Sequence, residues 1–251
     1  MIRKYYAKLV NSEKDRIKWR SHEPSRIEAF SDGVFALAVS LLIISLDAPH
    51  SSKELIEMMI AFIPFGLCFF VIFGVWFLQY KFFRRYGLRD TVTIVLNGFL
   101  LFVVLSYIYP LKFLFSSFYL PDKYIFSKED YTTVIVLYCL GAAIISFLFM
   151  LMYLNAWLKK DELKLTAAEI FETTTYILRN ISQVFIMLIF IFLMYATMWA
   201  AQKNTPGYQY IYLVFSLFIF TFVRLSRKRR NDLFKKRFGE TPMIEPHLGA
   251  E

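Results

Sequence analysis

The sequence predicts an all-α integral membrane protein with six membrane-spanning helices and both termini in the cytoplasm. Apolar residues make up 57% of the 251 positions, whereas soluble domains average roughly 45–50%. The apolar residues gather in six runs, each near the roughly 20 residues that a helix needs to cross a bilayer. Of the 29 Lys and Arg residues, 24 fall on one side of these runs, and the positive-inside rule places that side in the cytoplasm.

The six expected spans cover about 27–46, 55–79, 91–111, 131–157, 176–200 and 208–224. Pro64 lies inside the second span, where neighbouring helices can satisfy the carbonyl that a proline leaves free. Pro110 is expected to end the third span. The sequence therefore divides into a basic cytoplasmic arm (1–25), a six-helix transmembrane domain (26–224) and a basic cytoplasmic tail (225–251).

The net charge of +9 follows from this topology, because the basic residues cluster at the cytoplasmic ends of the spans. We therefore expect no nucleic-acid partner. The tail segment 224–238, RLSRKRRNDLFKKRF, has two interpretations. It either binds anionic lipid, since each basic residue near the membrane surface adds about 1 kcal/mol, or it is a plain stop-transfer anchor.

Signals for catalysis and metal binding are absent from the sequence. The three histidines, His22, His50 and His247, lie outside the six runs, so no histidine cluster forms within the membrane. Cys68 and Cys139 both fall inside apolar runs, where a free cysteine packs as a small hydrophobic residue. No metalloprotease, nucleotide-binding or hydrolase motif occurs. We expect no enzyme, no catalytic residue, no metal site and no cofactor.

The acidic residues argue weakly against ion-coupled transport. Transporters usually place carboxylates or broken helices near the membrane midplane. Here the acidic residues lie at the ends of the spans, namely Glu28, Asp32, Asp47, Glu54, Glu57, Asp130, Glu169 and Glu172.

The first span contains a line of branched apolar residues. At about 100° per residue, Leu41 and Ile44 lie within about 40° of Leu37 around the helix, and Ser40 flanks them at about 60°. Such a line is also typical of ordinary packing against lipid or protein, so spacing alone does not assign it a function.

A polar cluster precedes this line. Ser31 and Asp32 lie on the side of the helix away from Leu37. A carboxylate without a partner in this setting costs several kcal/mol, and hydrogen bonds from Arg26, Trp76 or Asn97 would remove that cost. Ser31 and Asp32 therefore either lock the helix against its neighbours or cap its beginning.

These residues resemble a known family. Arg26-x-x-x-Phe30-Ser31-Asp32-Gly33, followed by the apolar segment 34–42, looks like the signature of the transmembrane protein 175 potassium channels. Animal members of that family carry two six-span repeats. This chain has one, so it is similar to the prokaryotic members, which assemble as homotetramers.

The resemblance implies a potassium-permeable pore lined by the first helix of each subunit. No TVGYG-like filter occurs here, although potassium channels of the common type depend on one. The implied residues are Leu37 as the narrowest hydrophobic ring, Leu41 and Ile44 as further rings, Ser40 as a hydroxyl layer, and Arg26, Phe30, Ser31 and Asp32 as the network that holds the pore helix.

We therefore expect a homotetrameric potassium channel with passive permeation through a hydrophobic constriction, in a prokaryotic inner membrane. Asp47, at the outer end of the first span, either concentrates cations at the mouth or is an ordinary solvated carboxylate. An ion-coupled secondary transporter and a noncatalytic membrane scaffold are the alternative functions.

Overall fold

Long helices make up almost all of the structure, a computed structural model that describes residues 20, 25–44, 51–119, 128–202 and 228–233. No strand occurs within these residues. Residues 228–233 form a short helical segment. The long helices are α2 (Arg26–Ile44), α3 (Ser52–Tyr86), α4 (Thr91–Tyr119), α5 (Lys128–Leu158) and α6 (Ala167–Gln202).

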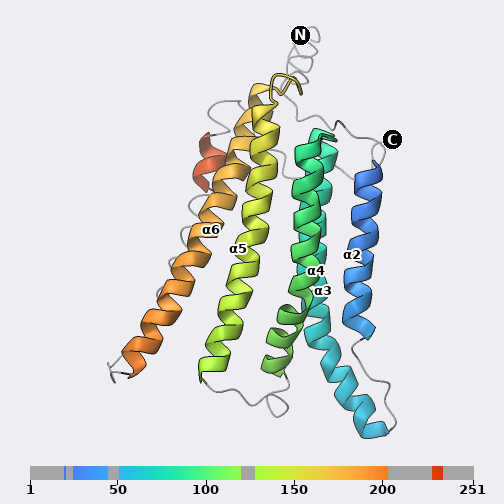
Figure 1. Ribbon diagram of the computed structural model, residues 1–251, viewed down its shortest axis with the longest axis vertical. Coiled ribbons are helices and arrows are strands. Elements are labelled where there is room, and N and C mark those ends of the chain that lie inside the picture. The colour runs from blue at the N-terminus through green and yellow to red at the C-terminus, as the bar shows by residue number, and fades with distance from the viewer. Residues whose placement is uncertain (1–19, 21–24, 45–50, 120–127, 203–227, 234–251) are drawn as a thin grey trace, which may run out of the picture.

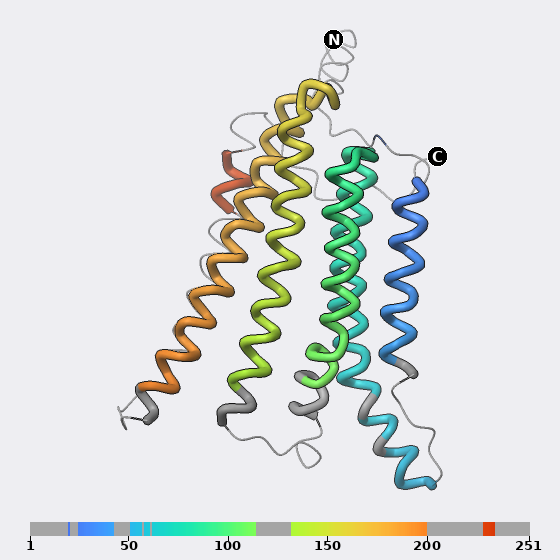
Figure 2. Tube along the Cα trace, viewed as in Figure 1, coloured from blue at the N-terminus to red at the C-terminus, as the bar shows by residue number. Residues whose placement is uncertain are grey.

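The helices pack largely in the order of the sequence. α2 contacts both α3 and α4, α3 contacts α4, α4 contacts α5, and α5 contacts α6. Figure 1 shows α2, α3 and α4 grouped on one side of the bundle and the α5–α6 pair on the other. The same grouping is visible along the trace in Figure 2. The bundle therefore has a three-helix part that contains the candidate pore helix and a two-helix part beside it.

Four of the described helices are long and apolar enough to cross a membrane, and they correspond to the second to fifth expected spans. Helix α2 is shorter, with 19 residues that include Arg26, Glu28 and Asp32. The sixth expected span, 208–224, lies outside the described residues. The all-α membrane fold is confirmed, whereas the six-span count and the orientation of the termini stay predictions.

Local sequence signals explain where the helices begin. At the start of α2, the Ser25 backbone N–H donates to Glu28 Oε1 (3.0 Å), and the Glu28 backbone N–H lies 3.4 Å from Ser25 Oγ. At α6, the Thr166 backbone N–H donates to Glu169 Oε2 (2.8 Å), and the Glu169 N–H donates to Thr166 Oγ1 (3.3 Å). Both are capping boxes, which satisfy backbone N–H groups left free in the first turn of a helix.

The connection between α3 and α4 is short and sharply defined. Helix α3 ends at Gly87, which adopts a left-handed conformation with φ of 60° and donates its N–H to the Phe83 carbonyl (2.8 Å). Glycine adopts this conformation without the steric cost that a Cβ imposes. Asp90 then caps α4, since the Thr93 backbone N–H lies 3.4 Å from Asp90 Oδ2, and the Thr93 hydroxyl also donates to Asp90 Oδ1 (2.7 Å).

Two expected helix boundaries are wrong. Pro110 does not end the third helix, because α4 continues to Tyr119, and Figure 1 shows the helix axis bending in its lower part. A proline removes one backbone hydrogen bond and kinks a membrane helix, but neighbouring helices allow the helix to continue. Helix α6 begins at Ala167 rather than near 176, because the capping box of Thr166 and Glu169 starts it earlier.

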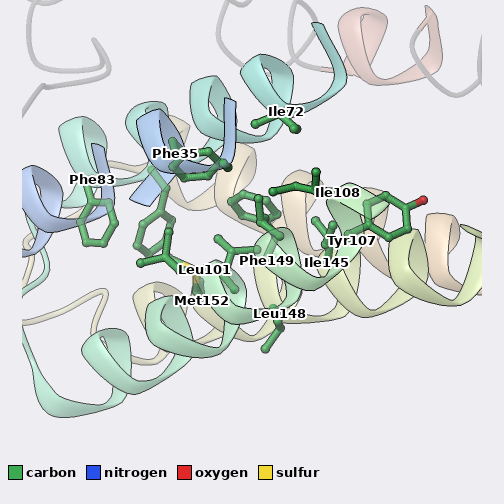
Figure 3. Packing of buried hydrophobic residues seen from close by; sticks show 14 of the residues in the cluster. Phe35, Ile72, Phe83, Leu101, Tyr107, Ile108, Ile145, Leu148, Phe149 and Met152 are labelled. Carbon is green, nitrogen blue, oxygen red and sulfur yellow. The ribbon is translucent and has the colours of Figure 1, made fainter. Parts of the chain in front are cut away.

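The interior contains aromatic and branched side chains from α2 to α5, while many large apolar side chains point outwards. Phe70, Phe102 and Phe192 are 68%, 67% and 71% exposed, which is typical of a surface that faces lipid or another subunit. Figure 3 shows the interior cluster, in which side chains of α2, α3, α4 and α5 meet. Its members include Phe35, Ile72, Phe83, Leu101, Ile108, Phe149 and Met152.

Candidate pore helix and its polar anchors

Helix α2 has one buried face. Ser31, Phe35, Ala38 and Leu42 recur at helical spacing and are 0%, 4%, 0% and 1% exposed. They pack against α3 and α4, which are the described helices that contact α2. The rotation of α2 about its axis is therefore fixed by its packing on these two helices.

The opposite face of α2 is open in the single chain. Phe30, Gly33, Leu37 and Ser40 are exposed, and we refer to these four residues as the exposed face. Leu37 is 52% exposed. The Ser40 hydroxyl donates to the Ala36 carbonyl (2.9 Å), which satisfies its proton within the helix. Its oxygen lone pairs consequently remain available as weak acceptors on the exposed face.

The structure describes only some of the other residues predicted for the constriction and the outer mouth. Leu41 is partly buried and packs at the edge of the interior cluster. Ile44 is the last residue of α2, and its side chain lies outside the described set. Asp47, the predicted outer-mouth carboxylate, lies outside the described residues as well.

A buried chain of hydrogen bonds joins α2 to α3 and α4. Gln79 Nε2 donates to Asn97 Oδ1 (2.6 Å), and Asn97 Nδ2 donates to Ser31 Oγ (2.9 Å). The Ser31 hydroxyl donates in turn to the Ile27 carbonyl (2.7 Å). Gln79 and Asn97 are each 2% exposed. We refer to Gln79, Asn97 and Ser31 as the polar chain. It fixes the positions of three helices relative to one another, because Asn97 on α4 bonds both to Gln79 on α3 and to Ser31 on α2.

Asp32 is held by a second contact. The indole Nε1 of Trp76 on α3 donates to Asp32 Oδ1 at 2.7 Å. Unlike the polar chain, this contact lies at the surface of the single chain. Ser31 and Asp32 thus both bond to side chains of neighbouring helices, whereas the helix cap is made by Ser25 and Glu28. Their role as a lock on α2 stays a prediction.

Arg26 and Phe30 are not brought into these contacts. Both are exposed, and Phe30 is 66% exposed. They lie on the same side of α2 as Leu37, opposite the buried Ser31. Among the described residues they therefore do not join the hydrogen bonds of Ser31 and Asp32, and their part in the network that the resemblance implies stays a prediction.

Polar contacts around the end of α3 and the beginning of α6 were not predicted from the sequence. Arg20 forms an ion pair with Glu169 (2.8 Å), and Arg85 forms one with Glu172 (2.8 Å). The Tyr86 and Thr173 hydroxyls lie 2.7 Å apart. The sequence does indicate the position of Glu169 at the beginning of α6, since Thr166-x-x-Glu169 is a capping-box pattern. Nothing in the sequence identifies Arg20 among the basic residues of the arm.

Asp90 belongs to the same end of the bundle. It accepts from Thr93 Oγ1 (2.7 Å) and from Asn155 Nδ2 (3.1 Å), and Lys159 Nζ lies 3.3 Å away. Burial acts to raise the pKa of Asp90, but these hydrogen bonds and the Lys159 charge outweigh it and lower the pKa to about 2. Within the described residues, no group of three or more His, Cys, Asp or Glu side chains could hold a metal ion.

Comparison with known proteins supports a single family. The family model for the endosomal/lysosomal potassium channel TMEM175 matches residues 26–107, which include α2, α3 and the polar chain. A potassium channel of Marivirga tractuosa is 33% identical over 249 residues, covering 93% of this chain and 100% of the relative. A potassium channel of Chamaesiphon minutus is 34% identical over 90 residues, which covers 33% of this chain and 44% of that protein.

Solved structures agree with these relatives. A crystal structure of a variant of the potassium channel MtTMEM175, in complex with a nanobody fusion protein, superposes with a TM-score of 0.73 at 35% identity and covers 85% of this chain and 97% of that chain. A TMEM175 homologue from Chamaesiphon minutus has a TM-score of 0.50 at 20% identity, with 78% and 98% covered; that likeness concerns the fold alone. On the full-length match to the Marivirga tractuosa relative, the chain belongs to the TMEM175 family.

Proposed function

We propose that this protein is a potassium-permeable cation channel in which the exposed face of α2 from each subunit lines a central pore. The observation that carries the proposal is the division of α2 into two faces. One face is buried and pinned by the polar chain, and the other leaves Leu37 52% exposed on a helix that also carries Ser40. Relatives named as potassium channels support the permeant ion.

The proposed assembly is a homotetramer with six spans per subunit and both termini in the cytoplasm. Four copies of Leu37 would form the narrowest ring, with Leu41 and Ile44 as further rings and Ser40 as a hydroxyl layer. An apolar neck conducts when it widens, or when the ion exchanges water for nearby dipoles. The arm 1–25, the domain 26–224 and the tail 225–251 keep the roles expected from the sequence. The membrane is proposed to be a prokaryotic inner membrane.

A flux assay in liposomes tests the proposal. Purified protein is reconstituted and the fluxes of potassium, sodium and caesium are compared under an imposed membrane potential. A channel gives a potential-driven potassium flux without saturation or proton coupling. A saturable, proton-coupled flux would instead identify a secondary transporter. Intact assembly without any flux would identify a scaffold.

Leu37 provides the residue-level test. Leu37→Ala and Leu37→Asn are expected to raise the current or to lower the preference for potassium, because a smaller or polar side chain removes the dewetted neck. Leu188→Ala is the matched control, since Leu188 is 51% exposed on α6, away from α2. If both Leu37 variants assemble and conduct as the unmodified protein does, the constriction lies elsewhere.

Asp47 is proposed to attract cations to the outer mouth. Asp47→Asn is then expected to lower conductance at low salt more than at high salt, because ions in solution screen a surface carboxylate. Equal conductance of the variant and the unmodified channel at low salt would make Asp47 an ordinary solvated residue.

A further inference from the structure

Arg20 is the point at which the basic arm is fixed to the helix bundle. Its guanidinium makes a two-pronged contact with Glu169, in which Nη1 lies 2.8 Å from Oε1 and Nη2 lies 2.9 Å from Oε2. The Glu169 side chain is 0% exposed and the Arg20 side chain is 17% exposed. Paired contacts of this kind are the strongest and most directional that arginine makes with a carboxylate.

Arg20 also binds the cytoplasmic end of α3. Its backbone N–H donates to the Arg84 carbonyl (3.0 Å), and its Nη1 lies 3.4 Å from the Arg85 carbonyl. These carbonyls belong to the last turn of α3, where backbone acceptors lack partners within the helix. A third contact, from Nε to the Leu163 carbonyl (3.1 Å), reaches the connection between α5 and α6. Arg20 therefore joins three parts of the bundle.

The Glu169 carboxylate has a second role, which fixes the position of its side chain. The same carboxylate that accepts from Arg20 also accepts from the Thr166 N–H in the capping box of α6. Glu169 therefore cannot turn towards solvent without opening the first turn of α6. A fully buried carboxylate that loses its cation is strongly destabilised. We refer to Arg20 and Glu169 as the arm latch.

The arm latch lies close to the candidate pore helix in sequence. Arg20 precedes Arg26, the first residue of α2, by six positions. Six residues span at most about 20 Å when fully extended, so the latch limits where α2 can begin. Ser25, which caps α2, is itself 8% exposed. The latch thus limits how far the base of α2 can lie from Glu169, while the middle of α2 is restrained by the polar chain.

We propose that Arg20 is a positioning residue for conduction, acting through the base of α2 rather than by touching the ion. This inference rests on the proposed channel function, and it assigns an effect on conduction to a residue on the proposed cytoplasmic side. Loss of the latch would free the first turns of α2 to tilt or rotate, which would change the spacing of the exposed faces around the pore.

The test compares Arg20→Gln with a matched variant that breaks a neighbouring ion pair. Glu172→Gln removes the contact between Arg85 and Glu172, which has the same 2.8 Å length and partners that are 13% exposed, yet it leaves the arm attached. Arg20→Lys keeps the charge but loses the two-pronged geometry. The full-length protein is used throughout, with two measurements, namely cation flux in liposomes and hydrogen exchange of the α2 backbone.

We expect Arg20→Gln to change the potassium-to-sodium flux ratio or the potassium current by roughly fivefold or more, the lower end of typical coupling between distant sites. Exchange in the first turns of α2 should accelerate by roughly tenfold, because a hydrogen-bonded charge pair no longer opposes local opening. Glu172→Gln should change neither measurement by this much, and Arg20→Lys should lie between Arg20→Gln and the unmodified protein.

Three outcomes would overturn the inference, and they are distinguishable. If the unmodified protein conducts potassium and Arg20→Gln conducts in the same way, the arm latch does not position the pore, while the channel function stands. If Glu172→Gln has the same effect as Arg20→Gln, the effect belongs to the stability of the cytoplasmic end in general. An unmodified protein without potassium flux overturns the proposed function itself, and this inference with it.

Discussion

The indole of Trp76 donates a 2.7 Å hydrogen bond to the carboxylate of Asp32 across the contact between α3 and α2. This bond lies at the surface of the single chain, beside the buried polar chain. Acceptance of a hydrogen bond lowers the free-energy cost of a carboxylate in an apolar setting, whereas a second subunit that covered this pair without supplying a further donor would raise that cost. The contact therefore has consequences for both the fold of one chain and its assembly.

Removal of the Trp76 donor is expected to weaken the attachment of α2. Trp76→Phe keeps an aromatic ring and deletes only the N–H, and Asp32→Asn removes the charge. Each should lower the free energy of unfolding by about 1–3 kcal/mol and reduce the fraction of the proposed tetramer that stays folded in detergent. Thermal unfolding and size-exclusion chromatography with light scattering measure these quantities. Trp157→Phe, which alters a tryptophan in contact with Lys160, is the control. An unchanged tetramer in the Asp32 and Trp76 variants would contradict the lock.

The polar chain predicts a compensating pair of substitutions. Asn97→Leu removes the acceptor of the buried Gln79 amide, and an unsatisfied buried group costs about 1–3 kcal/mol, whereas Ser31 keeps its bond to the Ile27 carbonyl. Adding Gln79→Met removes the unsatisfied amide. The double variant is therefore expected to be more stable than Asn97→Leu alone in unfolding experiments. Strictly additive losses would show that the two side chains do not depend on each other.

Close packing between α4 and α5 depends on Gly141. A Cβ at this position would collide with the ring of Tyr107, whose hydroxyl donates to the Tyr138 carbonyl at 2.7 Å. Gly141→Ala is expected to destabilise the protein by about 1–3 kcal/mol, as overpacking does. A second change, Tyr107→Leu, should recover part of the loss. Gly98→Ala, which meets nothing within 4 Å, is the control, and an equal loss there would contradict this explanation.

Asp90 predicts a pH dependence. Its pKa is lowered from 3.8 to about 2 in the folded protein, so its contribution to stability is fully present above pH 3.8 and is lost as the pH falls towards 2. The melting temperature of the unmodified protein should exceed that of Asp90→Asn at neutral pH, and the difference should shrink across this window. A difference that stays constant down to about pH 2 would show that the charge of Asp90 is not involved.

The fold class and the orientation of α2 were predictable from the sequence, because apolar runs of membrane length leave little choice of structure and helical spacing places Ser31 opposite Leu37. Trp76 was among the expected partners of Asp32, and the structure confirms it. Membership of the family also confirms the recognition and the expectation of a channel rather than an enzyme. The roles of Leu37, Ser40 and Asp47 in conduction stay predictions.

The partners of the remaining polar residues were not predictable. Asn97 was expected as a partner for Asp32, but it bonds to Ser31 and Gln79 instead. Helices that are apolar all round give no signal of how they rotate or slide against one another, and a hydrogen bond depends on shifts of about 1 Å. The contact of Arg20 with Glu169 joins residues 149 positions apart, and no local pattern connects them.

That separation has a consequence for how the chain is made. Each helix packs mainly on a neighbour in the sequence, so a helix that enters the membrane during synthesis finds its partner already in place. Arg20 emerges from the ribosome early, whereas its carboxylate partner follows 149 residues later. A nascent chain that stops before Glu169 therefore lacks the paired contact of Arg20, and formation of that contact marks a chain in which α2 to α5 have already been made.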